Sequence, residues 1–113
     1  RDSFSQELAP ARTFGFLKDV ETLRRSGLAR GGSLENAVVV DDSSVINAEG
    51  LRFANEFARH KALDVLGDLA LLGMPLLAKV RANKSGHALH HDLLRSLMDD
   101  PACYRIEALA ASA

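Results

Sequence analysis

Residues 55–75, with the sequence NEFARHKALDVLGDLALLGMP, form the longest helical pattern in this chain. At ~100° per residue, the apolar side chains between Ala62 and Ala70 fill one arc of roughly 140° to 300° around the axis. Gly73 and Pro75 end the pattern, because glycine favours a helix C-terminus and proline cannot continue a helix. We therefore predict a helix from about Asn55 to Leu72.

The polar side of this helix carries His60, Asp64 and Asp68 at steps of four residues. Aspartate is a mediocre helix former, and a solvated face usually recruits Glu, Lys and Arg instead. One interpretation is still a solvated face, with Lys61 balancing the aspartates. The other is that His60 and Asp64, one turn apart, converge on a metal ion. A catalytic zinc site takes three protein ligands, so periodicity alone leaves both interpretations open.

Apolar and turn-forming residues on either side of this helix predict the remaining elements. Strands are expected at 3–9, 36–42, 44–47, 75–82 and 103–109, and helices at 13–28 and 85–100. Gly27 should end the first helix, Asp41–Ser44 should turn a hairpin, and Ser85 should cap the last helix. The alternation of strands and helices predicts a single α/β (α+β) domain over residues 1–113. We expect a two-layer sandwich, with helices packed on one mixed β-sheet and a small β-hairpin insert.

Composition excludes several classes of protein. The 113 residues include 14 Lys and Arg against 15 Asp and Glu, without a basic run, so we expect no nucleic-acid partner. No apolar stretch reaches the ~20 residues of a transmembrane helix. The N-terminal residues lack the pattern of a signal peptide. Cys103 is the single cysteine, which excludes an internal disulfide and indicates a reducing compartment, so we expect a cytoplasmic protein.

A second polar motif, NKSGHALHH, occupies residues 83–91. Lys84 and Ser85 precede a helix whose unpaired backbone N–H groups suit a phosphate group. His87 lies in the first turn, where the helix dipole opposes protonation unless a carboxylate such as Asp68 restores the balance. Such a histidine suits general acid chemistry. The alternative is an ordinary surface helix start.

The same motif contains a spacing that is typical of zinc pairs. His87 and His91 are four residues apart, but no third ligand lies nearby in the sequence. We expect the His90 side chain to point away from this pair, and His91 with Asp92 to form a solvated face.

Together, four stretches resemble the zinc-dependent UDP-3-O-acyl-N-acetylglucosamine deacetylases of lipid A synthesis. They are ARTFGFLKDVE (11–21), GGSLENAVVVDD (31–42), GLRFANEFARHKALDVLGD (50–68) and KSGHAL (84–89). The combination R-H-K-x-x-D-x-x-G-D with a later K-S-G-H is more specific than either part. The resemblance runs from about Phe4 to Asp100 and covers only the second, C-terminal domain of the family. The N-terminal domain, which supplies a third zinc-binding histidine and the proposed general base, is absent from this chain.

The resemblance implies a role for each polar residue. His60 and Asp64 match the two Zn²⁺ ligands of this half, and Asp68 matches the carboxylate that orients the catalytic histidine, here His87. In the family, water activated by zinc attacks the acetamide carbonyl. His87 would act as general acid or as an electrostatic stabiliser, and the sequence does not separate these roles. Thr13 matches a hydroxyl near the reacting carbonyl, although it could simply cap a helix.

The resemblance also implies a substrate, a UDP-linked acylated amino sugar, and a partner, the chain's own N-terminal domain. Lys61 and Lys84 match positions near the diphosphate, unless they are ordinary surface lysines. An apolar passage for the acyl chain, or alternatively plain core, would be formed by Phe14, Phe16, Leu17, Val20, Ala29, Ala37 and Val39. Asn83 and the His90–His91 pair depart from the usual aromatic residue and Asn-Asn pair. The alternative function is a non-catalytic module that binds acyl or nucleotide ligands.

Overall fold

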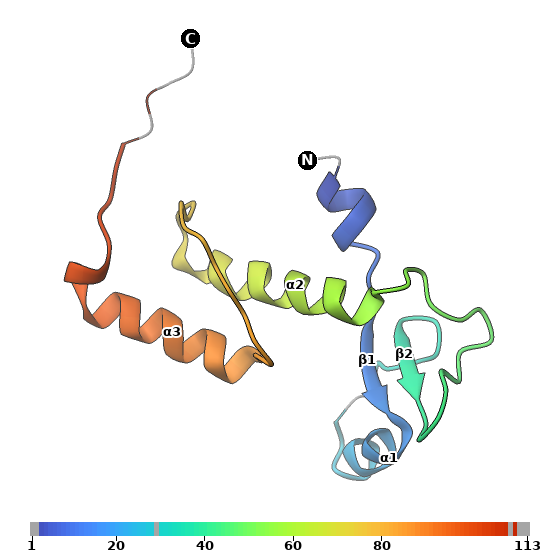
Figure 1. The fold of residues 1–113 in the computed structure, drawn as a ribbon. Coiled ribbons are helices and arrows are strands. Elements are labelled where there is room, and N and C mark those ends of the chain that lie inside the picture. Colours follow the sequence, from blue (N-terminus) through green and yellow to red (C-terminus); the bar gives the residue numbers. More distant parts are fainter. Residues whose placement is uncertain (1–2, 29, 109, 111–113) are drawn as a thin grey trace. The chain divides into compact units, whose positions relative to one another are not determined.

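The computed structural model describes residues 3–28, 30–108 and 110. The elements follow the order η1 (Phe4–Leu8), β1 (Thr13–Phe16), α1 (Leu17–Arg25), β2 (Ala37–Val40), α2 (Glu56–Leu69), η2 (Ala70–Leu72), α3 (His87–Asp99) and η3 (Pro101–Cys103) (Figure 1). Helices and a small sheet confirm the α+β class. The chain forms two compact units, the first ending at Leu63 and the second beginning at Asp64.

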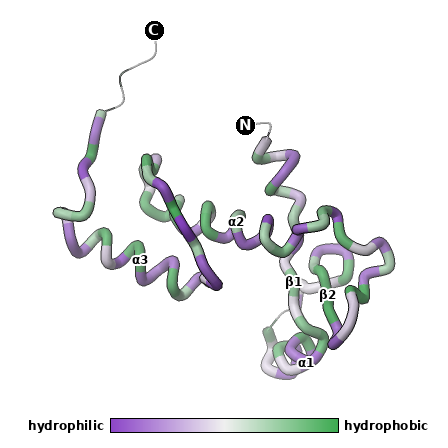
Figure 2. Tube along the Cα trace, viewed as in Figure 1, coloured by the Kyte–Doolittle hydropathy of each residue, from purple (hydrophilic) through white to green (hydrophobic). Residues whose placement is uncertain are grey.

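The sheet of the first unit is small. β1 and β2 pair in parallel, with Thr13 opposite Ala37 and Phe16 opposite Val40. Val38 is completely buried, and β2 is hydrophobic along its whole length (Figure 2). The predicted hairpin after β2 is present as one antiparallel bridge between Val40 and Val45. Its turn is stabilised by the Asp41 carboxylate, which accepts hydrogen bonds from the backbone N–H groups of Ser43 and Ser44.

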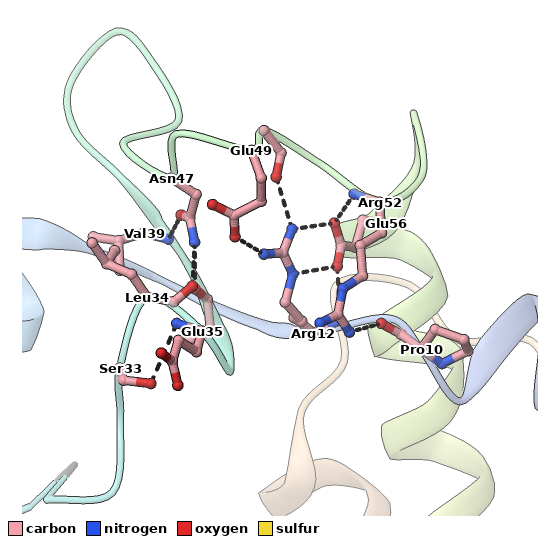
Figure 3. A network of polar contacts seen from close by, with 12 residues as sticks. Pro10, Arg12, Ser33, Leu34, Glu35, Val39, Asn47, Glu49, Arg52 and Glu56 are labelled. Carbon is pink, nitrogen blue, oxygen red and sulfur yellow. Dashed lines mark hydrogen bonds and ion pairs between the residues drawn. The ribbon is translucent and has the colours of Figure 1, made fainter.

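A buried ion pair ties the start of α2 to the residue that precedes β1. The Arg12 Nε and backbone N–H groups both donate to Glu56 Oε1 at 2.9 Å, and the backbone N–H of Arg52 donates to Oε2 at 2.8 Å (Figure 3). Desolvation raises the pKa of Glu56, but these hydrogen bonds outweigh it and lower the pKa to about 2. Glu56 is therefore ionised inside the first unit, which places α2 next to β1.

A buried asparagine organises the loop around β2. The Asn47 side chain accepts a hydrogen bond from the Val39 N–H and donates to the carbonyl groups of Leu34 and Ala37, each at 2.8 Å (Figure 3). Asn47 is only 4% exposed. A buried amide with all these partners pairs backbone groups of β2 and of the loop before it.

The predicted helix at 55–72 is confirmed, as α2 and η2. Gly73 follows η2 with φ = 73°, a left-handed conformation that glycine adopts without steric cost. The helix predicted at 85–100 is also confirmed, as α3. Ser85 is not its cap, however, because Gly86 occupies the N-cap position and no side chain caps this end.

Several strand predictions are wrong. Residues 3–9 contain the η1 helix, and the first four residues of the helix predicted at 13–28 form β1 instead. Residues 75–82 have no regular structure and are all exposed. Cys103 ends η3, residues 104–108 have no regular structure, and residue 109 lies outside the described residues. A short apolar run signals burial but cannot form a strand without a neighbouring strand to pair with.

Within the described residues, no helix has both the length and the apolar character needed to span a membrane.

Candidate active site

The polar cluster of the second unit joins the last turns of α2 to the first turns of α3. His87 Nδ1 lies 2.7 Å from Asp68 Oδ2, and His87 Nε2 lies 3.9 Å from Asp64 Oδ1. The two aspartates are four residues apart, so they share one side of α2. Their side chains are 13% exposed, whereas the His87 side chain is 62% exposed. The cluster therefore presents one accessible imidazole in front of two sheltered carboxylates.

The backbone before α3 sets the position of His87. Lys84 has φ = 49°, and Gly86 is extended, with φ = −151° and ψ = 177°. The left-handed conformation is costly for a residue with a Cβ atom, by ~1 kcal/mol. This turn makes His87 the first residue of α3, so its imidazole emerges at the helix N-terminus.

Asp68 accepts two hydrogen bonds at one oxygen. Besides His87 Nδ1, His90 Nδ1 lies 2.6 Å from the same Oδ2 atom, and His91 Nε2 lies 3.5 Å from Oδ1. The hydrogen bond with His90 and then that with His87 lower the pKa of Asp68 to about 2. Because an ionised carboxylate only accepts, both Nδ1 atoms carry the hydrogen.

The prediction for His90 is wrong. The residue is 5% exposed, contacts Asp68 through Nδ1, and lies 2.8 Å from Ser85 Oγ through Nε2. Ser85 therefore binds a side chain of α3 rather than the free backbone groups of the helix. His90 is three residues after His87, so it lies near it on the helix surface. That spacing was the available signal for a shared partner.

The ligand atoms of Asp68, His87 and His90 lie within 4.8 Å of one another, a separation at which three such groups could hold a metal ion. The oxygen–nitrogen distances of 2.6 and 2.7 Å fit hydrogen bonds. A metal would require both Nδ1 atoms to lose their hydrogens and turn their lone pairs toward the ion. The distances within the cluster are those of hydrogen bonds.

His60, in the first unit, has the surroundings expected of a metal ligand. Its Nδ1 lies 3.0 Å from the carbonyl oxygen of Ala11, which can only accept, so Nδ1 carries the hydrogen and Nε2 carries the lone pair. Metal-binding histidines usually donate their second ring N–H to a carbonyl or carboxylate in this way. Asp64 follows His60 by one turn of α2. The hydrogen bond to Ala11 therefore leaves His60 with a ring nitrogen of the kind that binds zinc.

Two other predicted site residues surround His60. Phe14 packs against Phe57, with ring centroids 4.5 Å apart, and meets the His60 ring edge-on at 6.4 Å. The Lys61 ammonium group lies 5.8 Å from the centroid of Phe14. Thr13 is exposed at the start of β1, so the alternative that it caps a helix is wrong. Lys84 is exposed in the second unit, in the turn before α3.

The residues predicted to contact the acyl chain have different surroundings. Phe16 and Leu17 line a shallow pocket of about 250 Å³, together with Lys18, Glu21, Val40, Asp41 and Asp42. Phe14, in the same strand as Phe16, contacts Phe57 and His60. Val20 lies beside Gly15, and Ala37 and Val39 are half-buried in β2. Ala29 lies outside the described residues.

Comparison with known proteins identifies the family of this chain. The family model of LpxC, UDP-3-O-acyl N-acetylglycosamine deacetylase, matches residues 1–99. A UDP-3-O-acyl-N-acetylglucosamine deacetylase of Myxococcus xanthus is 58% identical over 91% of this chain and 33% of its own length. A protein of the same name in Anaeromyxobacter sp. is 55% identical over 98% of this chain and 36% of its own length. Another, in Acidithiobacillus ferrooxidans, is 59% identical over 87% of this chain and 32% of its own length. The chain thus spans about a third of the length of the curated relatives it matches. It belongs to the family of UDP-3-O-acyl-N-acetylglucosamine deacetylases.

Proposed function

We propose that this chain forms the second half of the active site of a zinc-dependent deacetylase, which removes the N-acetyl group from a UDP-linked, 3-O-acylated N-acetylglucosamine. The proposal is carried by the hydrogen bond between His87 and Asp68, with Asp64 on the other side of the same imidazole. An accessible imidazole backed by an ionised carboxylate is what general acid catalysis requires. The names of the relatives supply the reaction and the substrate class.

His60 and Asp64 would hold the zinc ion, and the third protein ligand would come from an N-terminal domain of the family. The hydrogen bond between His60 Nδ1 and the Ala11 carbonyl supports this role, because it leaves the ring lone pair on Nε2. When bound, zinc supplies a Lewis acid that polarises the acetamide carbonyl and activates water.

His87 would donate a proton as the amide bond breaks. Asp68 holds the Nδ1 hydrogen, so Nε2 is the atom from which a proton would pass to the departing amine as the C–N bond breaks. The negative charge of Asp68 stabilises the imidazolium that this step needs. The positive charge of the His87 imidazolium would also stabilise the developing oxyanion.

The remaining predicted residues would bind the substrate. Lys61 and Lys84 would attract the diphosphate, and Thr13 would donate to the reacting carbonyl region. Phe16 and Leu17, which line the pocket beside β1, would contact the acyl chain.

Zinc content and activity, measured together in a full-length enzyme that contains these residues, test the proposal. His87→Ala should keep the metal and lower kcat by ~10²–10⁴, the range for losing a positioned acid or base. Asp64→Ala should lose the metal, because it removes a ligand. Metal analysis and deacetylation of the UDP-sugar give the two readouts. Loss of zinc in His87→Ala, with zinc kept in Asp64→Ala, would exchange the two assignments. Substrate binding without turnover in the unaltered protein would support a binding module instead.

A further inference from the structure

We propose that His90 is a positioning residue, which orients His87 by donating a second hydrogen bond to Asp68 Oδ2. This inference rests on the proposed function, since it assigns a role within the same site. The two imidazoles donate to one oxygen from successive turns of α3, at 2.7 Å for His87 and 2.6 Å for His90. One carboxylate therefore couples an exposed ring to a buried ring.

Both nitrogens of the buried ring lie within hydrogen-bond distance of a partner, Asp68 for Nδ1 and Ser85 for Nε2. His90 is 5% exposed, and its backbone N–H donates to the Gly86 carbonyl at 3.1 Å within the first turn of α3. The His87 side chain is 62% exposed. With His87 as its single partner, the Asp68 carboxylate could change rotamer. The His87 ring would then lose its fixed orientation. The contact with His90 removes that freedom.

Ser85 supports the tautomer that Asp68 imposes on His90. Nδ1 of His90 must carry a hydrogen, because Asp68 only accepts, so Nε2 of the neutral ring is an acceptor. Ser85 Oγ lies 2.8 Å from Nε2 and can donate its hydroxyl hydrogen to it. The direction of donation is then continuous, from Ser85 to His90 and from His90 to Asp68. His90 and His87 share the Asp68 carboxylate, and it is His87 that also approaches Asp64.

Three substitutions at His90 separate its two hydrogen bonds. Asparagine places its amide nitrogen near the position of Nδ1, so His90→Asn keeps a donor to Asp68. Glutamine reaches the position of Nε2, so His90→Gln keeps a partner for Ser85 and loses the donor to Asp68. His90→Phe fills the same space with neither group. The matched pair is Asn and Gln, which differ by one methylene.

In the full-length, zinc-loaded enzyme, His90→Gln and His90→Phe should lower kcat by about 10–100-fold, the range for losing a partner that orients an active-site group. KM and zinc content should stay unchanged, because His90 contacts neither Asp64 nor His60 among the described contacts. His90→Asn should stay within about 3-fold of the unaltered enzyme, since it keeps the hydrogen bond to the carboxylate. Equal kcat in the Asn and Phe variants would overturn the inference.

A nuclear magnetic resonance measurement on this chain tests the positioning role without activity. Long-range ¹H–¹⁵N spectra of the neutral imidazoles report which ring nitrogen carries the hydrogen. His87 should be mainly the Nδ1–H tautomer in the unaltered chain and in His90→Asn. It should move toward a mixture of tautomers in His90→Gln and His90→Phe. An unchanged His87 tautomer in these two variants would contradict the proposal.

Ser85→Ala provides a variant in which the buried ring is retained. It removes only the hydroxyl that lies against Nε2 of His90, so the shift of His87 toward mixed tautomers should be in the same direction and smaller. If the His90 variants fail to fold, this variant decides, and identical spectra for it and the unaltered chain would overturn the inference. Absence of deacetylation in every protein, with the expected tautomers present, would refute the proposed function and leave the positioning role standing.

Discussion

The guanidinium group of Arg12 and the carboxylate of Glu56 are almost completely enclosed in the first unit, with side-chain exposures of 3% and 0%. Arg12→Ala removes the main partner of a carboxylate that remains buried. Breaking such a pair typically costs ~3–5 kcal/mol, so we expect a loss of stability of about that size. Urea unfolding, followed through the amide signals of the first unit, measures it.

Glu49 provides the control for this substitution. It also binds Arg12, with Oε1 2.7 Å from Nη1, but its side chain is 57% exposed. Water can replace the interaction there, so Glu49→Ala should cost much less than Arg12→Ala. Arg12→Lys should fall between them, because an ammonium group cannot reproduce the fork of hydrogen bonds to Glu56. Similar losses for Glu49→Ala and Arg12→Ala would show that burial is not what makes this pair important.

At the same scale, the sequence predicts only part of the candidate site. The four-residue spacing of Asp64 and Asp68 is enough to place them on one side of a helix. The family resemblance pairs Asp68 with His87, and the two are in hydrogen-bond contact. The burial of His90 could not be predicted, because it depends on the turn at Lys84–Gly86, which brings Ser85 within reach of the ring.

Two glycines in and after α2 test what ends this element. Gly73 has φ = 73°, whereas Gly67 lies inside the helix, and a Cβ atom there would meet no described atom within 4 Å. Gly73→Ala should destabilise the chain by ~1 kcal/mol, since a side chain disfavours the left-handed conformation. Gly67→Ala should stabilise it by ~1 kcal/mol, because alanine is the better helix former. Urea midpoints of the two variants measure both effects.

The opposite signs are the essential result. Stabilisation by Gly73→Ala would mean that the turn after η2 does not need its left-handed residue. If Gly67→Ala stabilises this chain but lowers the activity of a full-length enzyme, then substrate or another domain requires the space above Gly67. That outcome would explain why a glycine interrupts a helix at a place where alanine fits.

For the elements, the two longest helices were predictable, whereas most of the strand predictions were wrong. The period of α2 and its ending at Gly73 are local properties, as is the amphipathic pattern of α3. β2 was recognised from AVVV, but its parallel partner Thr13–Phe16 looked like the start of a helix. Strand formation depends on a partner distant in sequence, and the apolar run at 75–82 shows that composition alone does not provide one.

Carboxylates in both units make the whole molecule sensitive to acid. The pKa lies below its ordinary value in Asp41, Glu49, Glu56, Asp68 and Asp100, and it reaches about 2 in Glu56 and Asp68. A depressed pKa means that the unfolded chain binds more protons than the folded chain. The resulting stability is present above the ordinary values and is lost as the pH falls.

We therefore expect the urea midpoint to fall between about pH 5 and about pH 2, with most of the loss completed as Glu56 and Asp68 become protonated. Glu56→Gln should flatten this dependence for amide signals of the first unit, and Asp68→Asn should flatten it for those of the second. Each substitution removes the carboxylate with the lowest pKa of one unit and leaves the other unit as an internal control. If Glu56→Gln changed the acid dependence of both units equally, the two units would unfold as one cooperative structure. If neither substitution changed it, the acid sensitivity would arise from the remaining carboxylates, and the hydrogen bonds to Glu56 and Asp68 would not govern the acid stability of this chain.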